Sequence, residues 1–436
     1  MHIVALNQFY APHRSATAQL LTELAEGLVQ RGHQVTVVAS DAGDGAGRVA
    51  AETMNGVSVV RVRATALGKK SLATRAADYG SFYVGALAAL SQVQHADVFL
   101  PLTTPPLVAV AAQVAALRAR TPVVALVQDL YPDIAVRLGV VGRGGLVHRA
   151  WGLAGAASLR AATRVITLSQ PMADEVARYG VGRERIDVIP NWALGEVEAG
   201  TTSAGGAEAR LEYGLGDRFV VMYSGNLGAG HQFETLLAAA RRLRERKDIV
   251  FVVVGEGVRK GEVERFVAEH QLDNVKLFPL APRERLAESL AAADVHLITM
   301  RDGLEGLIVP SKLYGILAAE RPAIFIGPRR DAIAETLAVS GCGLAFDNGD
   351  VTGVVQAVTD LAARPQAAQA MGALGRRHLD ERLGRERALV AYEDTLQRAT
   401  AVSTAARERK RQDSGRNLHE AGRSQAAGRS ERRRGE

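Results

Sequence analysis

The stretch Ala293–Gly327, ADVHLITMRDGLEGLIVPSKLYGILAAERPAIFIG, contains two strand-like runs, Val295–Thr299 and Ala323–Ile326, on either side of a loop and one short helix. A strand that leads into a helix N-terminus forms an anion site, because free backbone N–H groups and the positive end of the helix dipole point the same way. The stretch therefore predicts one β-α-β unit of a parallel sheet with an anion site in its loop.

The loop before this helix carries Pro310, Ser311 and Lys312. Pro310 fixes its own backbone, and Ser311 is expected to cap the helix. The predicted helix is Lys312–Glu320, because good helix formers continue until Pro322. A cation in the first turn opposes the helix dipole. Lys312 is therefore expected either to pair with a bound anion or to be an ordinary surface lysine.

The rest of the chain alternates strands and helices in two series, which predicts two doubly wound α/β domains facing across a cleft. No G-x-G-x-x-G follows the first strand, which argues against a redox dinucleotide enzyme. The predicted strands of the first series are His2–Asn7, Val35–Ala39, Val57–Val62, Val98–Leu100, Val123–Val127, Val165–Leu168 and Ile186–Ile189. Those of the second, besides the two above, are Phe219–Tyr223, Val250–Val254 and Val275–Leu277.

Composition changes mark the predicted boundaries. The first domain is residues 1–190, a Gly-, Ala-, Thr- and Glu-rich linker is 191–216, and the second domain is 217–380. A C-terminal helix at 381–403 is expected to pack back on the first domain. The Arg-rich tail, 404–436, is poor in apolar residues and is predicted to be disordered.

The net charge of +6 comes almost entirely from the tail. Residues 407–436 hold ten Lys/Arg against five acids, which leaves the first 406 residues at +1. A nucleic-acid-binding face is therefore not indicated, and the tail lacks the aromatic residues of an RNA-binding segment. The single cysteine, Cys342, excludes an internal disulfide and fits a reducing compartment. No signal peptide or membrane-spanning run is expected, so the predicted location is cytoplasmic.

Two glycine-rich loops follow strands of the second series and precede helices. We expect their backbone amides to approach a diphosphate, although either could be a simple turn. The candidate diphosphate- and nucleotide-binding residues are Gly225, Asn226, Leu227, Gly228 and His231 in the first loop, Gly255, Glu256, Gly257 and Arg259 in the second, and Pro310, Ser311 and Lys312.

In the first domain, Asp129 follows an apolar strand and could orient or deprotonate an acceptor hydroxyl, or could form a turn before Pro132. The other candidate acceptor-binding residues are His13, Arg14, Ser15, Gln128 and Asp133. No Cys/His cluster has the spacing of metal ligands, so no metal is predicted.

The motifs RGHQVTVVAS, IPNW, YSGNLGAGHQFETLLAA and VVGEGVRK resemble those of the family-four glycosyltransferases, retaining enzymes of the GT-B fold. VQDLYPD and IVPSKLYGILAAERPAIFIG are similar to the bacterial WbuB-like branch, which assembles O-antigen and exopolysaccharide. The similarity spans about residues 1–400. It implies a nucleotide-sugar donor in the second domain, an acceptor in the first, and no cofactor or metal.

The chain departs from this family at several positions. The two glutamates of the wider family fall on Leu307 and Gly315, with Glu305 and Glu320 nearby but out of register. The family's basic pair falls on Asn226 and His231, so Lys312 and Arg259 are expected to supply the charge. A histidine common in the cleft is replaced by Gln128, which gives Asp129 the catalytic role together with Lys312.

The sequence thus predicts a glycosyltransferase, moving a hexosyl or N-acetylamino sugar from a nucleoside diphosphate to a lipid-linked or glycan acceptor. The alternatives are a nucleotide-sugar epimerase of the same fold and a catalytically silent nucleotide-sugar-binding protein. A lipid-linked acceptor requires contact with the inner face of the plasma membrane. The basic residues expected to make it lie close to the apolar stretch Leu67–Tyr83 and are Arg61, Arg63, Lys69, Lys70 and Arg75.

Overall fold

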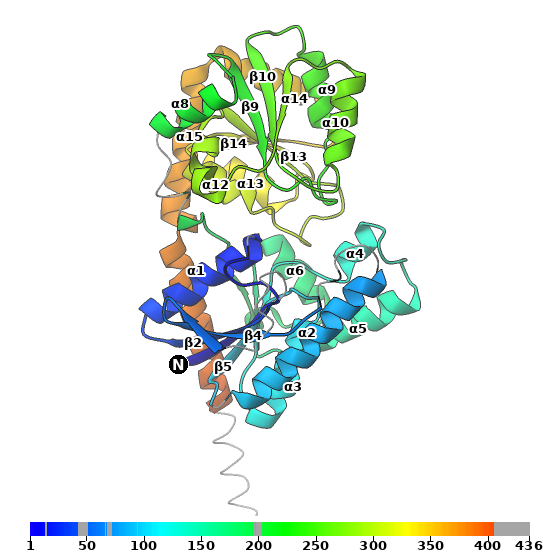
Figure 1. The fold of residues 1–436 in the computed structure, drawn as a ribbon, viewed down its shortest axis with the longest axis vertical. Coiled ribbons are helices and arrows are strands. Elements are labelled where there is room, and N and C mark those ends of the chain that lie inside the picture. Colours follow the sequence, from blue (N-terminus) through cyan, green and yellow to red (C-terminus); the bar gives the residue numbers. More distant parts are fainter. Residues whose placement is uncertain are drawn as a thin grey trace, which may run out of the picture.

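The structure, a computed structural model, describes residues 1–13, 15–41, 51–65, 67, 72–93, 95–195, 197 and 203–404. These residues form two α/β domains stacked end to end, with a long C-terminal helix running along both (Figure 1). The predicted pair of doubly wound domains is confirmed. Arg14, Lys69 and Lys70 lie outside the described residues, as does the predicted tail apart from Thr404.

The first domain has a mostly parallel sheet with helices on both sides. The strand order is β3-β4-β2-β1-β5, and a parallel bridge between Phe99 and Val123 joins this sheet to β6-β7-β8. The strands are β1 (His2–Leu6), β2 (Gln34–Ser40), β3 (Ala51–Met54), β4 (Val57–Val62), β5 (Val98–Pro101), β6 (Val124–Val127), β7 (Arg164–Thr167) and β8 (Ile186–Val188). The helices are α1 (Ala16–Gln30), α2 (Leu72–Gln92), α3 (Val108–Ala119), α4 (Asp133–Arg137), α5 (Leu146–Ala161) and α6 (Gln170–Arg178).

The second domain has a fully parallel sheet in the order β11-β10-β9-β12-β13-β14. Its strands are β9 (Phe219–Ser224), β10 (Ile249–Val254), β11 (Val275–Phe278), β12 (Val295–Thr299), β13 (Ala323–Ile326) and β14 (Gly343–Phe346). Its helices are α9 (Glu234–Arg242), α10 (Lys260–Glu269), α11 (Leu286–Ala291), α12 (Lys312–Ala318), α13 (Ala332–Ser340), α14 (Val351–Ala363) and α15 (Pro365–His378). Every residue of β10 and β12 is buried, as expected of strands covered on both faces.

The opening stretch folds as predicted, with one correction. β12 and β13 have the predicted bounds, and α12 ends two residues before the predicted end. Ser311 occupies the N-cap position, but its side chain accepts no hydrogen bond from the helix, so the predicted cap is wrong. Its backbone is already in the helical region, with φ −68° and ψ −10°, whereas a capping serine usually has an extended backbone.

The segment predicted as a linker contains a helix, α8 (Ser203–Glu212). The α8 helix packs against the second domain, where Arg210 Nη1 donates to Ala292 O at 3.0 Å and also pairs with Asp294 at 3.2 Å. Residues 203–212 therefore belong to the second domain in space.

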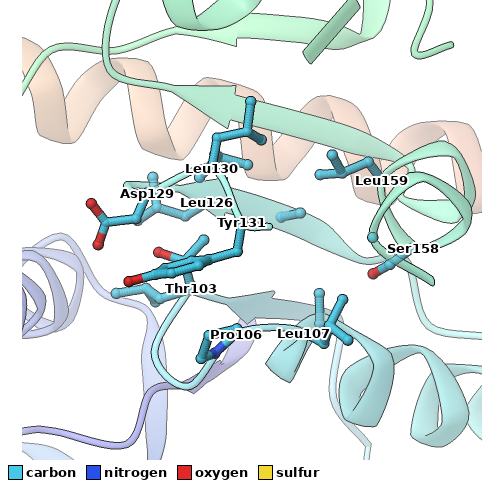
Figure 2. A pocket seen from close by; sticks show the side chains of 14 residues that line it. Thr103, Pro106, Leu107, Leu126, Asp129, Leu130, Tyr131, Ser158 and Leu159 are labelled. Atoms are coloured by element: carbon cyan, nitrogen blue, oxygen red, sulfur yellow. The ribbon is translucent and has the colours of Figure 1, made fainter. Parts of the chain in front are cut away.

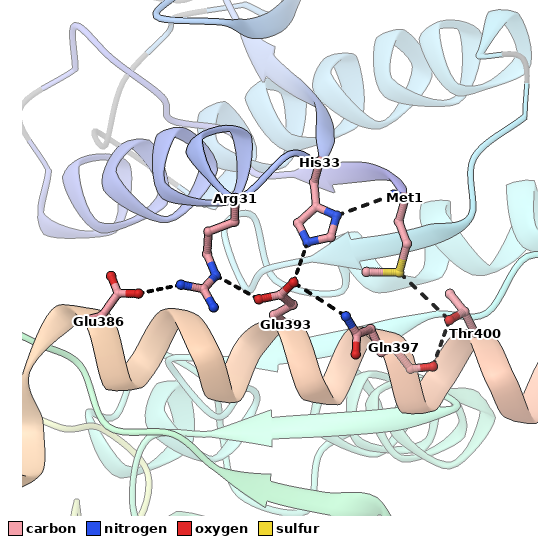
Figure 3. A network of polar contacts seen from close by, with 7 residues as sticks. All are labelled: Met1, Arg31, His33, Glu386, Glu393, Gln397 and Thr400. Atoms are coloured by element: carbon pink, nitrogen blue, oxygen red, sulfur yellow. Dashed lines mark hydrogen bonds and ion pairs between the residues drawn. The ribbon is translucent and has the colours of Figure 1, made fainter.

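The C-terminal helix, residues 385–404, ties the end of the chain to the first domain. Glu393 accepts hydrogen bonds from Arg31 Nε at 2.7 Å and from His33 Nε2 at 3.0 Å (Figure 3). On its buried side the helix presents Leu389, Tyr392 and Leu396 to the first-domain core. This helix thus covers an apolar surface that the first domain cannot cover with its own residues.

Two truncations should separate the C-terminal helix from the tail. Removing residues 405–436 should leave the melting temperature unchanged, because that segment is poor in apolar residues. Ending the chain at Gly384 also removes Leu389, Tyr392 and Leu396, and should lower the free energy of unfolding by about 5 kcal/mol or more. Thermal and denaturant unfolding measure both, and equal stability of the two truncated proteins would contradict this account.

Candidate active site

Lys312 lies over the glycine loop that follows β9. Its Nζ is 3.4 Å from Asn226 O and 3.4 Å from His231 Nε2, and lies 4.7 Å from the centre of the Tyr223 ring. A Cβ added at Gly225 would be 3.0 Å from Lys312 Cε, so a glycine here lets the lysine approach the loop. The structure therefore brings together Lys312 and the first predicted loop.

His231 positions this lysine. Its Nδ1–H donates to Thr299 O at 2.6 Å, which leaves the lone pair of Nε2 facing Lys312. Burial, together with the nearby charges of Lys312 and Arg259, lowers the pKa of His231 to about 3. The ring is therefore a neutral acceptor for the lysine ammonium rather than a second cation.

The ammonium of Lys312 lacks a counter-ion among the described residues. Burial lowers its pKa to about 7, because the charged form has lost much of its hydration. No carboxylate of the described chain lies within ion-pairing distance, and the Tyr223 ring face offers only a weak attraction. A bound anion would supply what this side chain lacks.

The two glycine-rich loops interlock at the same edge of the sheet. Leu227 N–H donates to Glu256 O at 2.8 Å, and Arg259 N–H donates to Leu227 O at 3.0 Å. A Cβ at Gly255 would lie 2.1 Å from Gly225 O. A Cβ at Gly257, whose φ is +151°, would lie 2.4 Å from Leu227 O. Only glycine allows this approach, so the two loops form one preformed surface.

The other predicted residues of this site differ in whether their charges are already paired and in how exposed they are. Arg259 Nη1 donates to His231 O at 2.5 Å, but its charge is already paired with Glu234 and Glu262 at 2.7 and 2.6 Å. The Glu256 carboxylate pairs with Lys260. Gly228 lies in the loop beside His231, Pro310 is buried, and Ser311 is exposed.

Arg301 belongs to the same site and was not singled out from the sequence. Its N–H donates to Gly230 O at 3.0 Å, and its Nη1 is 3.4 Å from Ala229 O. No carboxylate among the described residues pairs with it. Its position two residues after β12 was the available signal, because residues at that point lie at the same edge of the sheet as the two loops.

Asp129 stands where the two domains touch. Its backbone forms an antiparallel bridge with Ile308, and Leu130 N–H donates to Leu307 O at 3.0 Å. Burial raises the pKa of Asp129 to about 6. A carboxyl group whose pKa lies this close to neutral pH can accept a proton from a substrate hydroxyl.

Three buried polar atoms at the carboxyl edge of the first-domain sheet have no hydrogen-bond partner among the described residues. They are Asn7 Oδ1, Thr103 Oγ1 and Gln128 Oε1. These residues follow β1, β5 and β6, which are neighbours in the sheet, so all three lie at its carboxyl edge. Buried polar atoms are normally paired. Of the three, sequence reasoning identified only Gln128, and the positions of Asn7 and Thr103 just beyond apolar strands were the missed signal.

A cavity of about 50 Å³ adjoins Asp129 and extends between α3 and α5. Figure 2 shows the Asp129 carboxylate at one end and Leu159 and Ser158 at the other, with Tyr131 and Leu107 between. The lining is apolar except for Asp129, Thr103, Tyr131 and Ser158. The cavity therefore suits an apolar group that is attached to a polar one.

The remaining predicted acceptor residues have local structural partners. Ser15 Oγ accepts from Ala18 N–H at 3.4 Å and caps α1. His13 stacks on Phe9, with ring centres 4.1 Å apart, and its Nδ1 lies 3.1 Å from Ser15 Oγ. Asp133 accepts a hydrogen bond from the Tyr179 hydroxyl. These contacts fix loop conformation, and Arg14 lies outside the described residues.

The positions of the family's two glutamates are occupied by packing contacts. Leu307 is buried, and a Cβ at Gly315 would lie 3.2 Å from Leu290 Cδ1. Glu305 has one buried carboxylate oxygen without a partner in the described part of the chain. Burial, with Glu305 as a nearby charge, raises the pKa of Asp331 to about 6. Glu305 is thus an available carboxylate close to the expected position.

Two family models match the chain, one to each domain. The Glycosyl transferase 4-like domain matches residues 16–192, and the Glycosyl transferases group 1 domain matches residues 208–378. The chain belongs to the family-four glycosyltransferases of the GT-B fold. Within the described residues, no helix is long and apolar enough to cross a membrane, and no three His, Cys, Asp or Glu side chains cluster as metal ligands would.

Relatives and solved structures agree with this assignment. The putative colanic acid biosynthesis glycosyl transferase WcaI of Escherichia coli is 30% identical over 45% of this chain and 49% of its own length. The probable glycosyltransferase WbjE of Pseudomonas aeruginosa is 24% identical over 62% and 67%. The first match thus spans about half the length of that relative. The crystal structure of Anabaena Alr3699/HepE with UDP superposes with a TM-score of 0.69 at 13% identity, over 91% of this chain and 100% of that one, which shows the fold.

A matched pair of glycine substitutions should test the interlocked loops. Gly255→Ala places a methyl group against Gly225 O and should destabilise the protein by about 2 kcal/mol or more. Gly261→Ala in α10 meets nothing within 4 Å and should stabilise it by about 0.5–1 kcal/mol. Denaturant unfolding measures both, and a neutral Gly255→Ala would show that the loops can separate.

The Asp129 carboxyl should make stability depend on pH. Its pKa is about 6 in the folded protein and about 4 when unfolded, so protonation is favoured by folding. At about pH 4 the wild type and Asp129→Asn should be similarly stable. At about pH 8 the variant should be more stable, by about 1–3 kcal/mol, because the charge no longer has to be buried. Urea unfolding at both pH values measures these stabilities. A stability difference between the two proteins that does not change with pH would contradict the raised pKa of Asp129.

Proposed function

We propose that this protein transfers a sugar from a nucleoside diphosphate, bound by the second domain, to a hydroxyl of an acceptor bound by the first. The observation that carries the proposal is Lys312, a half-buried ammonium that His231 holds against the glycine loop and that has no counter-ion in the described part of the chain. A diphosphate is an anion that this arrangement fits, because it would give the ammonium a negative partner beside a glycine-rich loop whose backbone a phosphate can approach closely.

The same groups suit the chemical step. When the bond between the sugar C1 and the diphosphate breaks, negative charge grows on the leaving phosphate. Lys312, Arg301 and the loop amides can stabilise that charge without rearranging. Retention of the anomeric configuration, as in the related family, and independence of metal are parts of this proposal. Product NMR and activity in the presence of a chelator test them.

The acceptor is proposed to lie against the first domain with its hydroxyl at Asp129. Asp129 takes the proton of that hydroxyl as its oxygen bonds to the sugar. The oxygens of Asn7, Thr103 and Gln128 that have no partner within the described residues are available to further polar groups of the acceptor or the donor sugar. The apolar cavity between α3 and α5 favours an acceptor carrying an apolar group, such as a lipid-linked one. Cell-surface polysaccharide synthesis at the inner face of the membrane would provide such a lipid-linked acceptor.

Two other functions can be distinguished from this one by measuring nucleotide release. An epimerase would release nucleotide without an acceptor, whereas a silent binding protein would bind the donor and release nothing. The absence of a glutamate at Leu307 and Gly315 favours neither, because Glu305 offers a carboxylate nearby for the ribose or sugar hydroxyls. Nucleotide release measured with and without acceptor separates the three.

Replacing Lys312 should weaken nucleotide binding and change its dependence on pH. A bound diphosphate would raise the pKa of Lys312 from about 7, so binding at about pH 8 should take up a proton. Lys312→Ala should abolish the uptake, weaken UDP binding by about tenfold or more, and lower kcat by about 10²-fold. Calorimetry in two buffers of different ionisation enthalpy measures the uptake.

Two controls accompany this experiment. Lys312→Arg keeps the charge but titrates far above pH 8, so UDP should bind it without proton uptake. Lys247→Ala removes an exposed lysine paired with Asp273, away from the site, and should change nothing. Equal UDP affinity in Lys312→Ala and the wild type would return Lys312 to an ordinary surface residue.

A further inference from the structure

Three neighbouring helices of the first domain expose apolar side chains to solvent. α3 contacts both α2 and α5, and the three lie side by side on one flank of the domain (Figure 1). Val84 of α2, Leu117 of α3 and Leu146 of α5 are 71%, 82% and 85% exposed. We call this surface the α2–α3–α5 face. Its other exposed large apolar residues are Leu87, Val110, Val114, Val147 and Leu153.

The spacing of these residues places the exposed apolar positions of each helix on one side of it. In α5 the exposed positions Leu146, Ala150, Leu153 and Ala157 recur every three or four residues, which places them on one side of the helix. Val110, Val114 and Leu117 do the same in α3. An amphipathic helix of a soluble protein normally directs such a stripe into the core. Here the stripes point outward, and the buried stripes of the same helices already face the sheet.

The charges of this face all have one sign among its described side chains. The sequences of α2, α3 and α5 contain a single acid, Asp78, which is buried and accepts hydrogen bonds from Thr65 Oγ1 and Leu67 N–H. Arg118 and Arg149 are exposed and have no carboxylate partner in the described chain. By contrast, α10 of the second domain exposes Glu262, Glu264 and Arg265 and has no apolar stripe on its outer side.

We propose that the α2–α3–α5 face docks the enzyme on an anionic phospholipid bilayer. This proposal rests on the proposed transfer to a lipid-linked acceptor and extends it. Apolar side chains that enter the interface, combined with arginines that meet anionic headgroups, provide the two signals that reversible membrane binding needs. A second copy of the chain fits this face less well, because a two-fold interface would bring the unpaired arginines together.

The location of the cavity supports a lipid bilayer as the partner of this face. The cavity lies between α3 and α5, beneath the proposed face, and reaches Asp129 (Figure 2). A carrier lipid anchored in the bilayer beside these helices could therefore place its hydroxyl-bearing end at Asp129. The sequence-based docking residues fit less well. Arg61 is committed to an ion pair with Glu52 at 2.9 Å, Arg63 has a partner, and the side chain of Arg75 is not described.

Vesicle sedimentation tests the proposal without any acceptor. The wild type should sediment at low salt with vesicles of equal parts phosphatidylcholine and phosphatidylglycerol, and much less with phosphatidylcholine alone. The triple variant Leu117→Ser, Leu146→Ser, Leu153→Ser should lose about a hundredfold in vesicle affinity, because three apolar side chains no longer enter the interface. Arg118→Gln with Arg149→Gln should weaken binding and reduce its dependence on salt.

Matched controls come from the second domain. Leu211→Ser with Val339→Ser removes two side chains that are 81% and 74% exposed, and should leave vesicle binding unchanged. All substituted residues are exposed, so thermal unfolding should be the same in every variant. Nucleotide release tests the transferase proposal separately and does not depend on the vesicles.

Two outcomes for the α2–α3–α5 face itself would overturn the docking proposal. One is a wild type that fails to sediment with the anionic vesicles. The other is a dimer, seen by analytical ultracentrifugation, that the triple leucine variant dissolves, which would assign the face to a second copy. Equal loss of vesicle binding in the second-domain control would also count against it, since the effect would then not belong to this face.

Discussion

The site depends on a desolvated ammonium that has no counter-ion among the residues that the structure describes. Lys312 could have been neutralised by a carboxylate, as Arg259 and Lys260 are where the second glycine-rich loop leads into α10. Instead its neighbours are a neutral imidazole, a backbone carbonyl and the face of an aromatic ring. The folded protein bears this unfavourable electrostatic term because β12, the loop and α12 are fixed by packing, and the free energy is recovered when an anion binds.

Local patterns in the sequence determined most of the fold. Strands such as β10 and β12 are continuous apolar runs, and β12 and β13 were located to the residue. The missed elements lack that signal. β3 is a short, polar edge strand that forms only because β4 offers it a partner. α8 is rich in glycine and alanine, and it is held by tertiary contacts through Arg210 rather than by its own propensity.

The candidate site was predictable in part, and for a physical reason. Glycines between a strand and a helix indicate close backbone approach, so Gly225, Gly255 and Gly257 could be identified. Whether a side chain is paired depends on residues far away in sequence, so it could not be predicted from local patterns. Asp133 is satisfied by Tyr179, whereas among the described residues Arg301 has no carboxylate partner and Asn7 Oδ1 has no donor. The backbone contact between Leu130 and Leu307 likewise involves no recognisable side chain.

The C-terminal helix has a consequence for the order of folding during synthesis. Arg31 and His33 leave the ribosome early, but their partner Glu393 is separated from them by about 360 residues. The surface that Tyr392 and Leu396 cover must therefore stay open while the whole second domain is made. The first domain cannot complete its core until the second domain has been synthesised. A nascent chain with that apolar groove exposed is a natural substrate for chaperones, and truncated products would be recognised as unfinished.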